Sequence, residues 1–405
     1  MDLKTKTFCY LVIIFLVLRY LYFIGVVTQN GIAGDLDFFK YQRSAYAIIN
    51  IKNDTPEEEI YRALHKDNEY TAYFPLFYIG LIPLYKMGNH VASIIWTLFN
   101  QLILLISIYF IIKAIKAKLS LITITLLVFM VTNFLPLEFN TASGQTNFLM
   151  LLSFSGCLYF LGKEKDCLAG IFLTLSILLK WFPIIFLIFL AWKKRYLSAV
   201  TCLFFIIVMF LLSIGCFGWK LHYIQLARII PDNIHEFEGF LTNHSLASNF
   251  QRLFRMDFPE SRGIMHFPLL ANVFSIATVL IFVFLTAKRL ITFGRGIKAS
   301  FPFEFAFSMC LILLIPSWLH IFHLTLAIIP LLIVFLNIEK IKPQIWIFIS
   351  SFILLGLEYW PDGLAIFRQG WGLLFLSGRT VGLVLLWLGY YLMLSRMSGL
   401  AVEEG

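Results

Sequence analysis

Long apolar runs, repeated along the whole chain, constrain this sequence more than any other feature. A helix of about 20 apolar residues crosses a bilayer, because inside lipid only helices and closed barrels satisfy every backbone polar group. The runs here are too long and continuous for the alternating strands of a membrane barrel. With 60% hydrophobic and only 14% charged residues, the chain also has more apolar surface than one soluble core can bury. We therefore predict an all-α, polytopic integral membrane protein.

The apolar runs predict about twelve transmembrane helices, with both termini in the cytoplasm. The spans are expected at residues 8–27, 74–88, 91–112, 119–136, 146–162, 168–192, 197–217, 267–287, 303–317, 321–338, 344–357 and 371–394. Basic residues gather in short turns such as 193–195, which is typical of cytoplasmic turns and explains the net charge of +9 without nucleic-acid binding. Lys113, Lys116 and Lys118 break this rule, since the count places them outside.

The run at residues 168–192 has an unusual interior. Lys180 and Pro183 lie near its middle, and charges and proline at membrane depth are tolerated where protein or a water-filled cavity receives them. The run is therefore expected to consist of two half-helices that meet at Lys180. The lysine either extends its amine to the interface or faces an anion.

Two loops are long enough to hold structure outside the cytoplasm, at residues 28–72 and 218–266. In the first, Thr55-Pro56-Glu57-Glu58 is a capping box, which predicts a short helix over residues 56–66. Ile60 and Leu64 lie one turn apart on it and would let it rest on the membrane surface. Neither loop is a separate domain, so residues 1–405 are predicted to form a single transmembrane domain.

Several polar residues at span boundaries are candidates for chemistry. Asp35 and Asp37 follow the first span, where a carboxylate can either cap a helix in water or accept a proton from a hydroxyl. Tyr73 belongs either to an interfacial aromatic belt or to a binding site. The polar block with Asn140, Gln145 and Asn147 is either a turn or a set of ligands in a cavity.

A second group of candidates lies towards the carboxyl-terminal half. This group includes two histidines beside Trp318, namely His320 and His323. Either they hydrogen-bond to a leaving phosphate as its negative charge grows, or they are ordinary residues of the membrane interface. Arg252 and Arg255 are candidate anion clamps, because guanidinium matches the geometry of phosphate oxygens.

Together and in this order, these motifs resemble glycosyltransferase family 87, the membrane mannosyltransferases of the C-type glycosyltransferase superfamily. The matching features are the acidic segment at Asp35, Tyr73-x-Pro75-Leu76, Pro136 followed by Asn140 and Gly144-Gln145-x-Asn147, Ala169-Gly170 followed by Lys180-x-x-Pro183, Asn243-x-Ser245-Leu246 with Arg252, and Pro316-Ser317-Trp318-x-His320. They extend over residues 35–323, most of the chain.

The resemblance implies a C-type architecture and an enzyme that moves a sugar, mannose by analogy, from a polyprenyl-phosphate donor to a lipid or glycan acceptor. Transfer would invert the anomeric centre, on the extracytoplasmic face of what is expected to be a bacterial inner membrane. By the same resemblance Asp35 is the catalytic base, with Asp37 as the other candidate, and His320 lies near the donor phosphate. The predicted donor-phosphate or substrate-binding residues are His320, Lys180, Arg252, Tyr73, Asn140, Gln145, Asn147, Asn243, Trp318 and His323. Since the leaving group is already an anionic phosphate, no metal or other cofactor is expected.

Two other functions stay open at this point. Twelve spans with both ends inside are also common in secondary transporters, although the chain shows no repeat between its halves. A C-type transferase or ligase that moves another lipid-linked sugar, or a preassembled glycan, would have similar motifs.

Overall fold

The computed structural model is almost wholly helical in the part of the chain that it describes. The described residues are 1–33, 36–52, 54–65, 73–232, 238–293, 300–338, 343–357 and 364–403. Within these ranges, pairing of the β type is confined to an isolated bridge between Arg262 and Gln369. The predicted all-α fold class is therefore confirmed.

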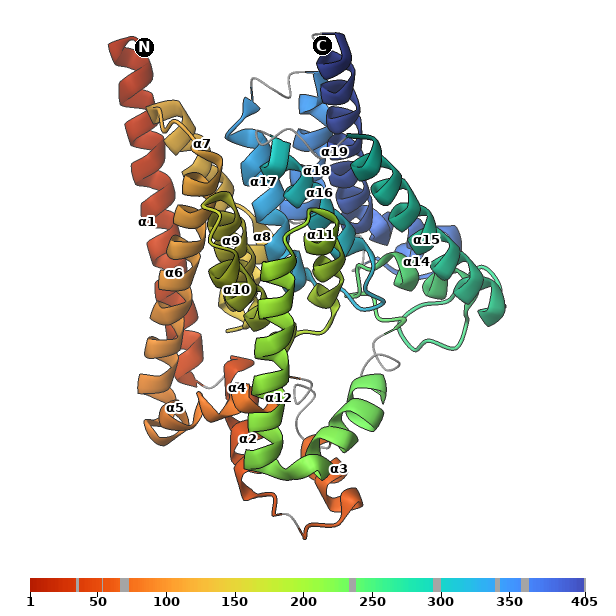
Figure 1. Cartoon of the computed structure of the whole chain (residues 1–405). Coiled ribbons are helices and arrows are strands. Elements are labelled where there is room, and N and C mark those ends of the chain that lie inside the picture. Colours follow the sequence, from red (N-terminus) through yellow and green to blue (C-terminus); the bar gives the residue numbers. More distant parts are fainter. Residues whose placement is uncertain are drawn as a thin grey trace. The chain divides into compact units, whose positions relative to one another are not determined.

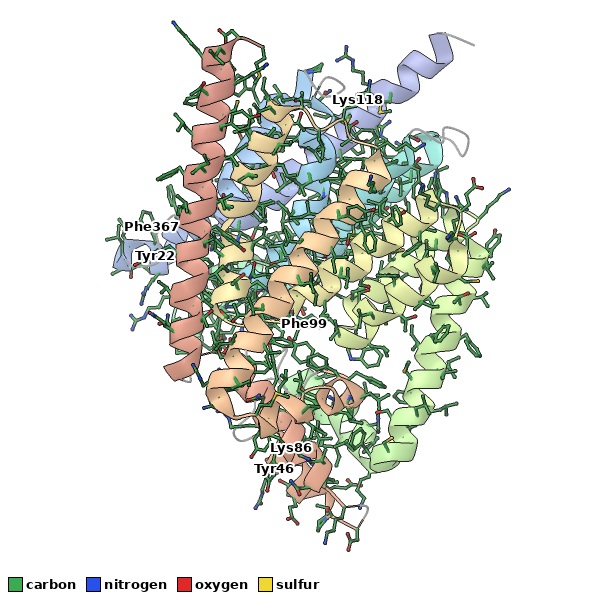
Figure 2. All side chains as sticks on the ribbon, turned by 90° about the vertical axis from the view of Figure 1, so that its left-hand side faces the viewer. Tyr22, Tyr46, Lys86, Phe99, Lys118 and Phe367 are labelled. Carbon is green, nitrogen blue, oxygen red and sulfur yellow. The ribbon has the colours of Figure 1, made fainter. Side chains whose placement is uncertain are left out.

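Five of the described helices are long and apolar enough to cross a membrane by themselves (Figure 1). They are α1 (Leu3–Ala33), α6 (Gly88–Ile115), α12 (Tyr196–Ile224), α15 (Pro268–Phe293) and α19 (Gly378–Glu403). The shortest have 26 residues, and at a rise of about 1.5 Å per residue even these exceed a hydrocarbon core of roughly 30 Å. Tyr22 on α1 and Phe99 on α6 are exposed along these helices, as expected of surfaces that face lipid (Figure 2).

A sixth candidate span is a bent pair of helices, α7 (Leu121–Thr132) and α8 (Leu135–Ala142), with an angle of 49° between them. Pro136 lies in the first turn of α8, where a proline costs the helix no hydrogen bond but stops α7 from continuing straight. The hydroxyl of Thr325 donates to the Pro136 carbonyl at 3.0 Å. The bend therefore leaves that carbonyl satisfied inside the protein.

The remaining apolar helices have 10 to 17 residues. They are α9 (Asn147–Gly162), α10 (Asp166–Leu179), η1 with α11 (Phe182–Ile185 and Phe186–Trp192), α16 (Phe301–Leu314), η4 with α17 (Ile321–Ala327 and Ile328–Phe335) and α18 (Ile345–Gly356). A 14-residue helix rises only about 21 Å, less than the thickness of the core. The described helices thus provide five or six spans by length and composition, and the count of twelve is not confirmed.

Residues 74–88 do not form the single spanning helix that was predicted. They form two five-residue helices, α4 (Pro75–Ile79) and α5 (Ile82–Lys86). A proline in the first turn of each helix sets a new helix start and interrupts the run. Tyr85 of α5 stacks on Tyr46 at a ring distance of 5.4 Å, and Tyr46 and Lys86 lie at the same end of the structure (Figure 2).

The predicted break in the run at residues 168–192 is confirmed. Helix α10 ends at Leu179, and Lys180 has an extended backbone with φ −147° and ψ 137°. The 3₁₀ turn η1, which contains Pro183, and the seven-residue helix α11 follow. A proline three residues after Lys180 removes a helical donor, so the chain cannot continue α10 through this point.

The first loop is held by its own helices. It contains α2 (Phe38–Asn50) and α3 (Glu57–His65), and the second of these confirms the helix predicted from the capping box. Ile60 and Leu64 are each only 1% exposed, so α3 buries them in the protein instead of resting them on a membrane surface. Its polar face is held as well, since the Tyr61 hydroxyl donates to Asp232 at 2.8 Å.

The second loop begins later than predicted. Helix α12 continues past Gly218, whose φ of 76° and ψ of 162° mark a kink, and a π-helical turn, η2 (Gln225–Ile229), follows. Further on lie α14 (Leu246–Phe254), η6 (Ala365–Arg368) and η7 (Gly370–Ser377). Only glycine adopts such a φ without strain, so Gly218 permits the change of direction.

The chain divides into two compact units. Unit 1 comprises residues 1–18, 111–139 and 237–405, and unit 2 comprises residues 19–110 and 140–236. Each unit is built from segments that are distant in sequence. The prediction of one transmembrane domain over residues 1–405 stays a prediction.

Candidate functional site

Asp37 lies at the start of α2 in unit 2, with both carboxylate oxygens in contact with other side chains. Lys40, one turn further along α2, lies 3.1 Å from Oδ1. The amide of Gln145 donates to Oδ2 at 2.9 Å. The Asp37 backbone N–H also donates to the Ser143 carbonyl at 2.9 Å, and the side chain remains 23% exposed. The carboxylate is therefore oriented by two side chains, the backbone of Asp37 is held by a third contact, and the carboxylate is still accessible.

The turn that presents Gln145 depends on a glycine. Gly144 has a φ of 65°, a left-handed conformation, and a Cβ on it would lie 3.1 Å from the Cβ of Phe38. The Trp96 indole donates to the Gly144 carbonyl at 2.8 Å, and its ring stacks on Phe38 at 4.7 Å. Within the polar block at residues 139–147, the turn is therefore confined to residues 143–146 between α8 and α9, and it packs against the start of α2.

Buried hydroxyl groups extend the contacts of Gln145. The Tyr41 hydroxyl donates to Gln145 Oε1 and lies 3.3 Å from the Tyr73 hydroxyl. The Thr146 hydroxyl donates to Tyr73 at 3.2 Å. Tyr41 is fully buried and Tyr73 is 5% exposed. Polar contacts therefore connect four side chains in sequence, from Asp37 through Gln145 and Tyr41 to Tyr73.

Lys180 joins the same group of residues from the break after α10. Its amine donates to the Asn147 side-chain oxygen at 3.1 Å and lies 5.8 Å from the centre of the Tyr73 ring. Asn147 in turn donates to Asn140 at 2.9 Å. An ammonium at membrane depth costs roughly 3 kcal/mol or more without partners, and an amide oxygen and an aromatic face are partners that reduce this cost.

Unit 2 therefore brings together six of the residues singled out from the sequence. We call this set, with Lys40 and Tyr41, the Asp37 cluster; the six are Asp37, Tyr73, Asn140, Gln145, Asn147 and Lys180. Asp35 lies outside the described residues. Sequence reasoning missed Lys40 and Tyr41, although their spacing of three and four residues from Asp37 places them on the same face of a helix that starts there.

In unit 1, Asn243 connects the second loop to the segment before η4. Its amide donates to the Ser317 carbonyl at 2.9 Å, and its oxygen accepts from the Leu319 N–H at 3.0 Å. The side chain is fully buried. These contacts hold residues 317–319 in place, which gives Asn243 a structural function in this conformation.

Arg252 is 1% exposed and is surrounded by loop groups. Its guanidinium donates to the carbonyls of Phe240 and Asn243 at 2.8 and 2.7 Å, and to the Ser248 hydroxyl at 2.7 Å. These bonds fold the segment between Phe240 and α14. The arginine predicted as an anion clamp thus stabilises the loop that carries Asn243.

His320 and His323 are oriented by each other and by aromatic rings. The His323 Nδ1 accepts from the His320 backbone N–H at 2.9 Å. The Trp318 and Phe322 rings meet the His323 ring edge to face at 5.6 and 4.7 Å. Phe322 also stacks on His320 at 4.3 Å. His323 is 2% exposed, while His320 is only partly buried, so His320 is the more accessible of the two imidazoles.

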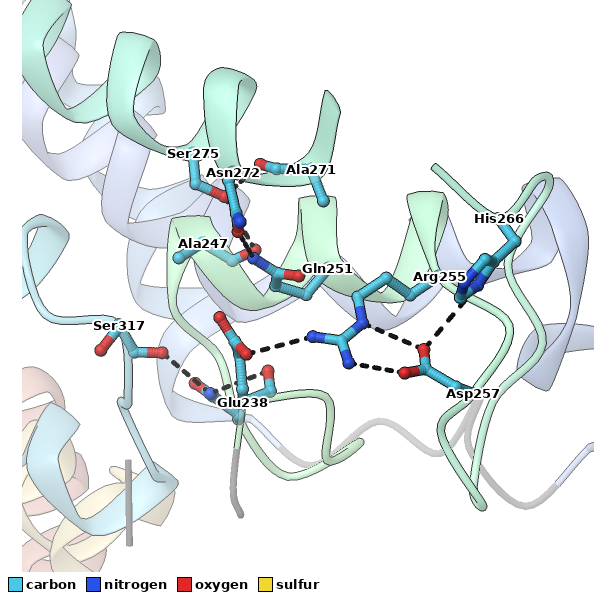
Figure 3. A network of polar contacts seen from close by, with 11 residues as sticks. Glu238, Ala247, Gln251, Arg255, Asp257, His266, Ala271, Asn272, Ser275 and Ser317 are labelled. Atoms are coloured by element: carbon cyan, nitrogen blue, oxygen red, sulfur yellow. Dashed lines mark hydrogen bonds and ion pairs between the residues drawn. The ribbon is translucent and has the colours of Figure 1, made fainter. Parts of the chain in front are cut away.

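Arg255 belongs to a separate ionic network (Figure 3). Its guanidinium donates to the two carboxylate oxygens of Asp257 at 3.0 and 2.6 Å and to Glu238 at 3.3 Å. The hydrogen bond from Arg255 holds the pKa of Asp257 below its usual value. Because its positive charge is matched by two acids, Arg255 is a weaker candidate for binding a ligand anion.

Among the described residues, no three His, Cys, Asp or Glu side chains are grouped as metal ligands would be. The expectation that the protein needs no metal or cofactor stays a prediction. What the residues provide is an accessible carboxylate in unit 2 and accessible nitrogen donors in unit 1.

Long apolar helices that enclose polar clusters define this chain as an integral membrane protein of the helical class. The profile of glycosyltransferase family 87 matches residues 70–319, more than half of the chain. The chain therefore belongs to glycosyltransferase family 87, and it is a membrane glycosyltransferase. In comparisons with curated proteins and with solved structures, no protein matched it significantly. The matched region includes all the predicted site residues except Asp35, Asp37, His320 and His323.

Proposed function

We propose that this glycosyltransferase moves a sugar, most simply mannose, from a polyprenyl-phosphate donor to a lipid or glycan acceptor, with inversion at the anomeric carbon. The reaction takes place on the extracytoplasmic face of a bacterial inner membrane. The observation that supports this best is the Asp37 carboxylate, oriented by Gln145 and Lys40 and still partly exposed.

Asp37 acts as the general base in this proposal. The acceptor hydroxyl oxygen attacks the anomeric carbon as the carboxylate takes the hydroxyl proton, and the bond from that carbon to the phosphate oxygen breaks. Attack from the side opposite the leaving phosphate inverts the centre. Gln145 and Lys40 hold the carboxylate while Tyr41 fixes the Gln145 amide. Asp35, whose position is not described, is the other candidate for the base.

The electron pair leaves with the phosphate, so the products are the glycosylated acceptor and polyprenyl phosphate. Nitrogen donors stabilise the charge that develops on the leaving oxygen. We assign this role to His320, oriented by Phe322, while Trp318 and His323 support it. Asn243 acts as a positioning residue, since it holds the segment that carries His320, and Arg252 does so indirectly by holding the loop that carries Asn243.

We propose that four residues of the Asp37 cluster bind the sugar or its phosphate next to the base. They are Lys180, Tyr73, Asn140 and Asn147. Amide groups and an ammonium at the broken end of α10 suit hydroxyl and phosphate oxygens. A donor with a polyprenyl chain remains anchored in lipid, so it reaches such a site sideways between helices. This explains why the proposed site lies on broken membrane helices and not in a soluble domain.

Family membership argues against a secondary transporter, because the family consists of glycosyltransferases. A transferase for another lipid-linked sugar remains the alternative within the proposal. Neither the Asp37 cluster nor His320 distinguishes mannose from other hexoses, since a carboxylate base and a phosphate site serve any of them.

The direct test is turnover by the purified protein with labelled polyprenyl-phosphate sugars and a lipid extract as the source of acceptors. Asp37→Asn keeps the shape of the side chain but cannot take a proton. Because a general base contributes about 10²- to 10⁴-fold, we expect turnover to fall by that factor while the melting temperature stays within a few degrees. The reaction is expected to persist in a chelator.

Asp54→Asn, a change of an exposed aspartate in the same loop, is the matched control and should leave turnover unchanged. Asp35→Asn is measured beside it. Loss of turnover in Asp35→Asn but not in Asp37→Asn would transfer the role of base to Asp35. Absence of any labelled glycolipid with every donor would contradict the proposed reaction.

A further inference from the structure

His244 and Arg379 form a pair that the sequence motifs did not single out. The guanidinium Nη1 of Arg379 lies 3.1 Å from the Nε2 of His244. An arginine only donates, so Nε2 accepts and a neutral His244 has its proton on Nδ1. Both residues belong to unit 1, and Arg379 lies beyond the region matched by the family profile.

The His244 ring is buried, but one of its polar atoms has no partner. The residue is 6% exposed, and its Nδ1 has no hydrogen-bond partner among the described residues. A buried donor without an acceptor costs about 1–3 kcal/mol. Such an atom is usually satisfied by an ordered water or by an oxygen of a bound ligand.

The backbone around His244 is fixed, so the ring is held in place. The His244 N–H donates to the Leu319 carbonyl at 2.7 Å, and the Thr380 hydroxyl donates to the His244 carbonyl at 2.7 Å. These two bonds connect the second loop both to the residue before His320 and to the residue after Arg379. His244, His320 and Arg379 are therefore gathered at one place by backbone contacts.

The charges at this place favour an anion. Burial lowers the pKa of His244 well below its usual value, and the nearby cationic groups Arg379, His320 and Arg252 lower it further. Arg379 and Arg252 are both positively charged, because arginine stays protonated in proteins. A phosphate oxygen accepts hydrogen bonds from imidazole N–H and from guanidinium, and it is negative as well.

We propose that His244 and Arg379 bind the phosphate of the polyprenyl-phosphate donor together with His320. The Nδ1–H of His244 donates to one phosphate oxygen. Arg379 provides the positive charge, and its guanidinium has five N–H donors, enough to bond the imidazole and an anion at once. This inference rests on the proposed function and extends its phosphate site to a residue on α19.

The test is equilibrium binding of a short-chain polyprenyl phosphate to the purified full-length protein, compared with the uncharged polyprenol. In Arg379→Gln we expect affinity for the phosphate to fall about 10- to 100-fold, as for loss of a charge-assisted hydrogen bond, with polyprenol binding unchanged. Arg396→Gln removes the same charge from an exposed position on the same helix, and it should bind as the wild type does.

Two variants of His244 separate its nitrogens. Glutamine places its amide near Nε2 and keeps the contact with Arg379, whereas asparagine places its amide near Nδ1. We expect His244→Gln to lose phosphate affinity and His244→Asn to retain most of it. If Arg379→Gln does not fold, Arg379→Lys, which keeps the charge, should show an intermediate loss. A purely structural pair would instead lower the melting temperature without changing the affinity of the folded fraction.

Wild-type affinity for the phosphate in both Arg379→Gln and His244→Gln would overturn the inference. If the wild type then still transfers sugar, only the inference fails. If no lipid-linked sugar is turned over but phosphate binding depends on Arg379, the anion site stands and the proposed reaction fails. Equal affinity for inorganic phosphate and polyprenyl phosphate would identify a site for free phosphate and contradict its assignment to the donor.

Discussion

At the scale of single residues, Gln145 connects the proposed base to the protein interior. Its nitrogen donates to Asp37, and its oxygen accepts from the buried Tyr41 hydroxyl. Because Tyr41 donates to the oxygen, the nitrogen is left to face the carboxylate. Gln145 is therefore a positioning residue, and its effect on turnover should pass through Asp37.

We expect Gln145→Leu to lower turnover by about 100-fold, the cost of misplacing a reacting group by roughly 1 Å. Stability should fall by about 1–3 kcal/mol, because the Tyr41 hydroxyl loses its acceptor. Steady-state turnover and thermal unfolding measure the two effects. Gln101→Leu is the matched control, since Gln101 also accepts from a tyrosine, Tyr20, at 2.9 Å. If both variants lose turnover equally, the effect is one of stability and not of positioning.

At the scale of elements, two breaks in the apolar helices create the Asp37 cluster. The turn at Gly144 separates α8 from α9, and the extended residue Lys180 ends α10. The turn at Gly144 brings the Ser143 carbonyl and the Gln145 side chain to Asp37, and the break after α10 brings Lys180 to Asn147. The breaks are therefore the structural cause of the site, and Gly144 is the one whose backbone conformation can be tested.

Gly144→Ala and Gly88→Ala form a matched pair for this test. Both glycines have positive φ, at 65° and 74°, so each alanine should cost about 1–2 kcal/mol in a left-handed conformation. Only at Gly144 would the new methyl group meet neighbours, with Phe38 at 3.1 Å and no atom within 4 Å at Gly88. We expect both variants to lose stability in thermal unfolding, but only Gly144→Ala to lose turnover. Equal turnover in the two variants would show that the conformation of this turn does not affect catalysis.

At the scale of the whole molecule, the Asp37 contacts constrain the topology. Asp37 bonds to Ser143 and Gln145, so these residues lie on the same side of the membrane. The number of crossings between them must then be even. The segment at residues 74–88 consists of two five-residue helices, which leaves α6 and the bent pair α7 and α8 as the two candidate crossings. If Asp37 lies on the extracytoplasmic face, as proposed, we expect Lys113, Lys116 and Lys118 to lie in the cytoplasm, in agreement with the rule for basic turns.

Cysteine labelling in intact and permeabilised cells tests this assignment, in a variant without the six native cysteines. Lys118→Cys and Asp54→Cys place single thiols at exposed positions in the turn after α6 and in the first loop. We expect a membrane-impermeant reagent to label Asp54→Cys in intact cells and Lys118→Cys only after permeabilisation. If the reagent labels both cysteines in intact cells, the assignment is wrong and residues 74–88 cross the membrane.

The same reasoning applies to residues 166–195. Arg195 lies 3.4 Å from Asp166, and the Ser198 hydroxyl donates to Asp166 at 2.8 Å. The two ends of the segment thus lie together, so we expect α10, η1 and α11 to enter the membrane and return, with Lys180 at the turn. Lys165→Cys and Tyr196→Cys, both exposed, should be labelled from the cytoplasmic side. Labelling from opposite sides would show that the segment crosses.

Sequence alone predicted the helical class, most of the apolar segments, the helix α3 and the break at Lys180. It did so because hydrophobic length, capping and proline act through neighbouring residues. It also indicated six members of the Asp37 cluster, but as separate motifs with competing explanations. The prediction of a span at residues 74–88 was wrong. Average hydropathy along a segment does not show where a proline ends one helix and starts another, and this segment has two such prolines.

Only the tertiary structure decided which polar residues meet. The bond from Gln145 to Asp37 joins residues 108 positions apart, and the contact of Arg379 with His244 joins residues 135 apart. No local pattern specifies such pairs, because they depend on how helices pack and where they break. The sequence determined that polar groups would be buried in a membrane protein, and the packing determined which of them became partners.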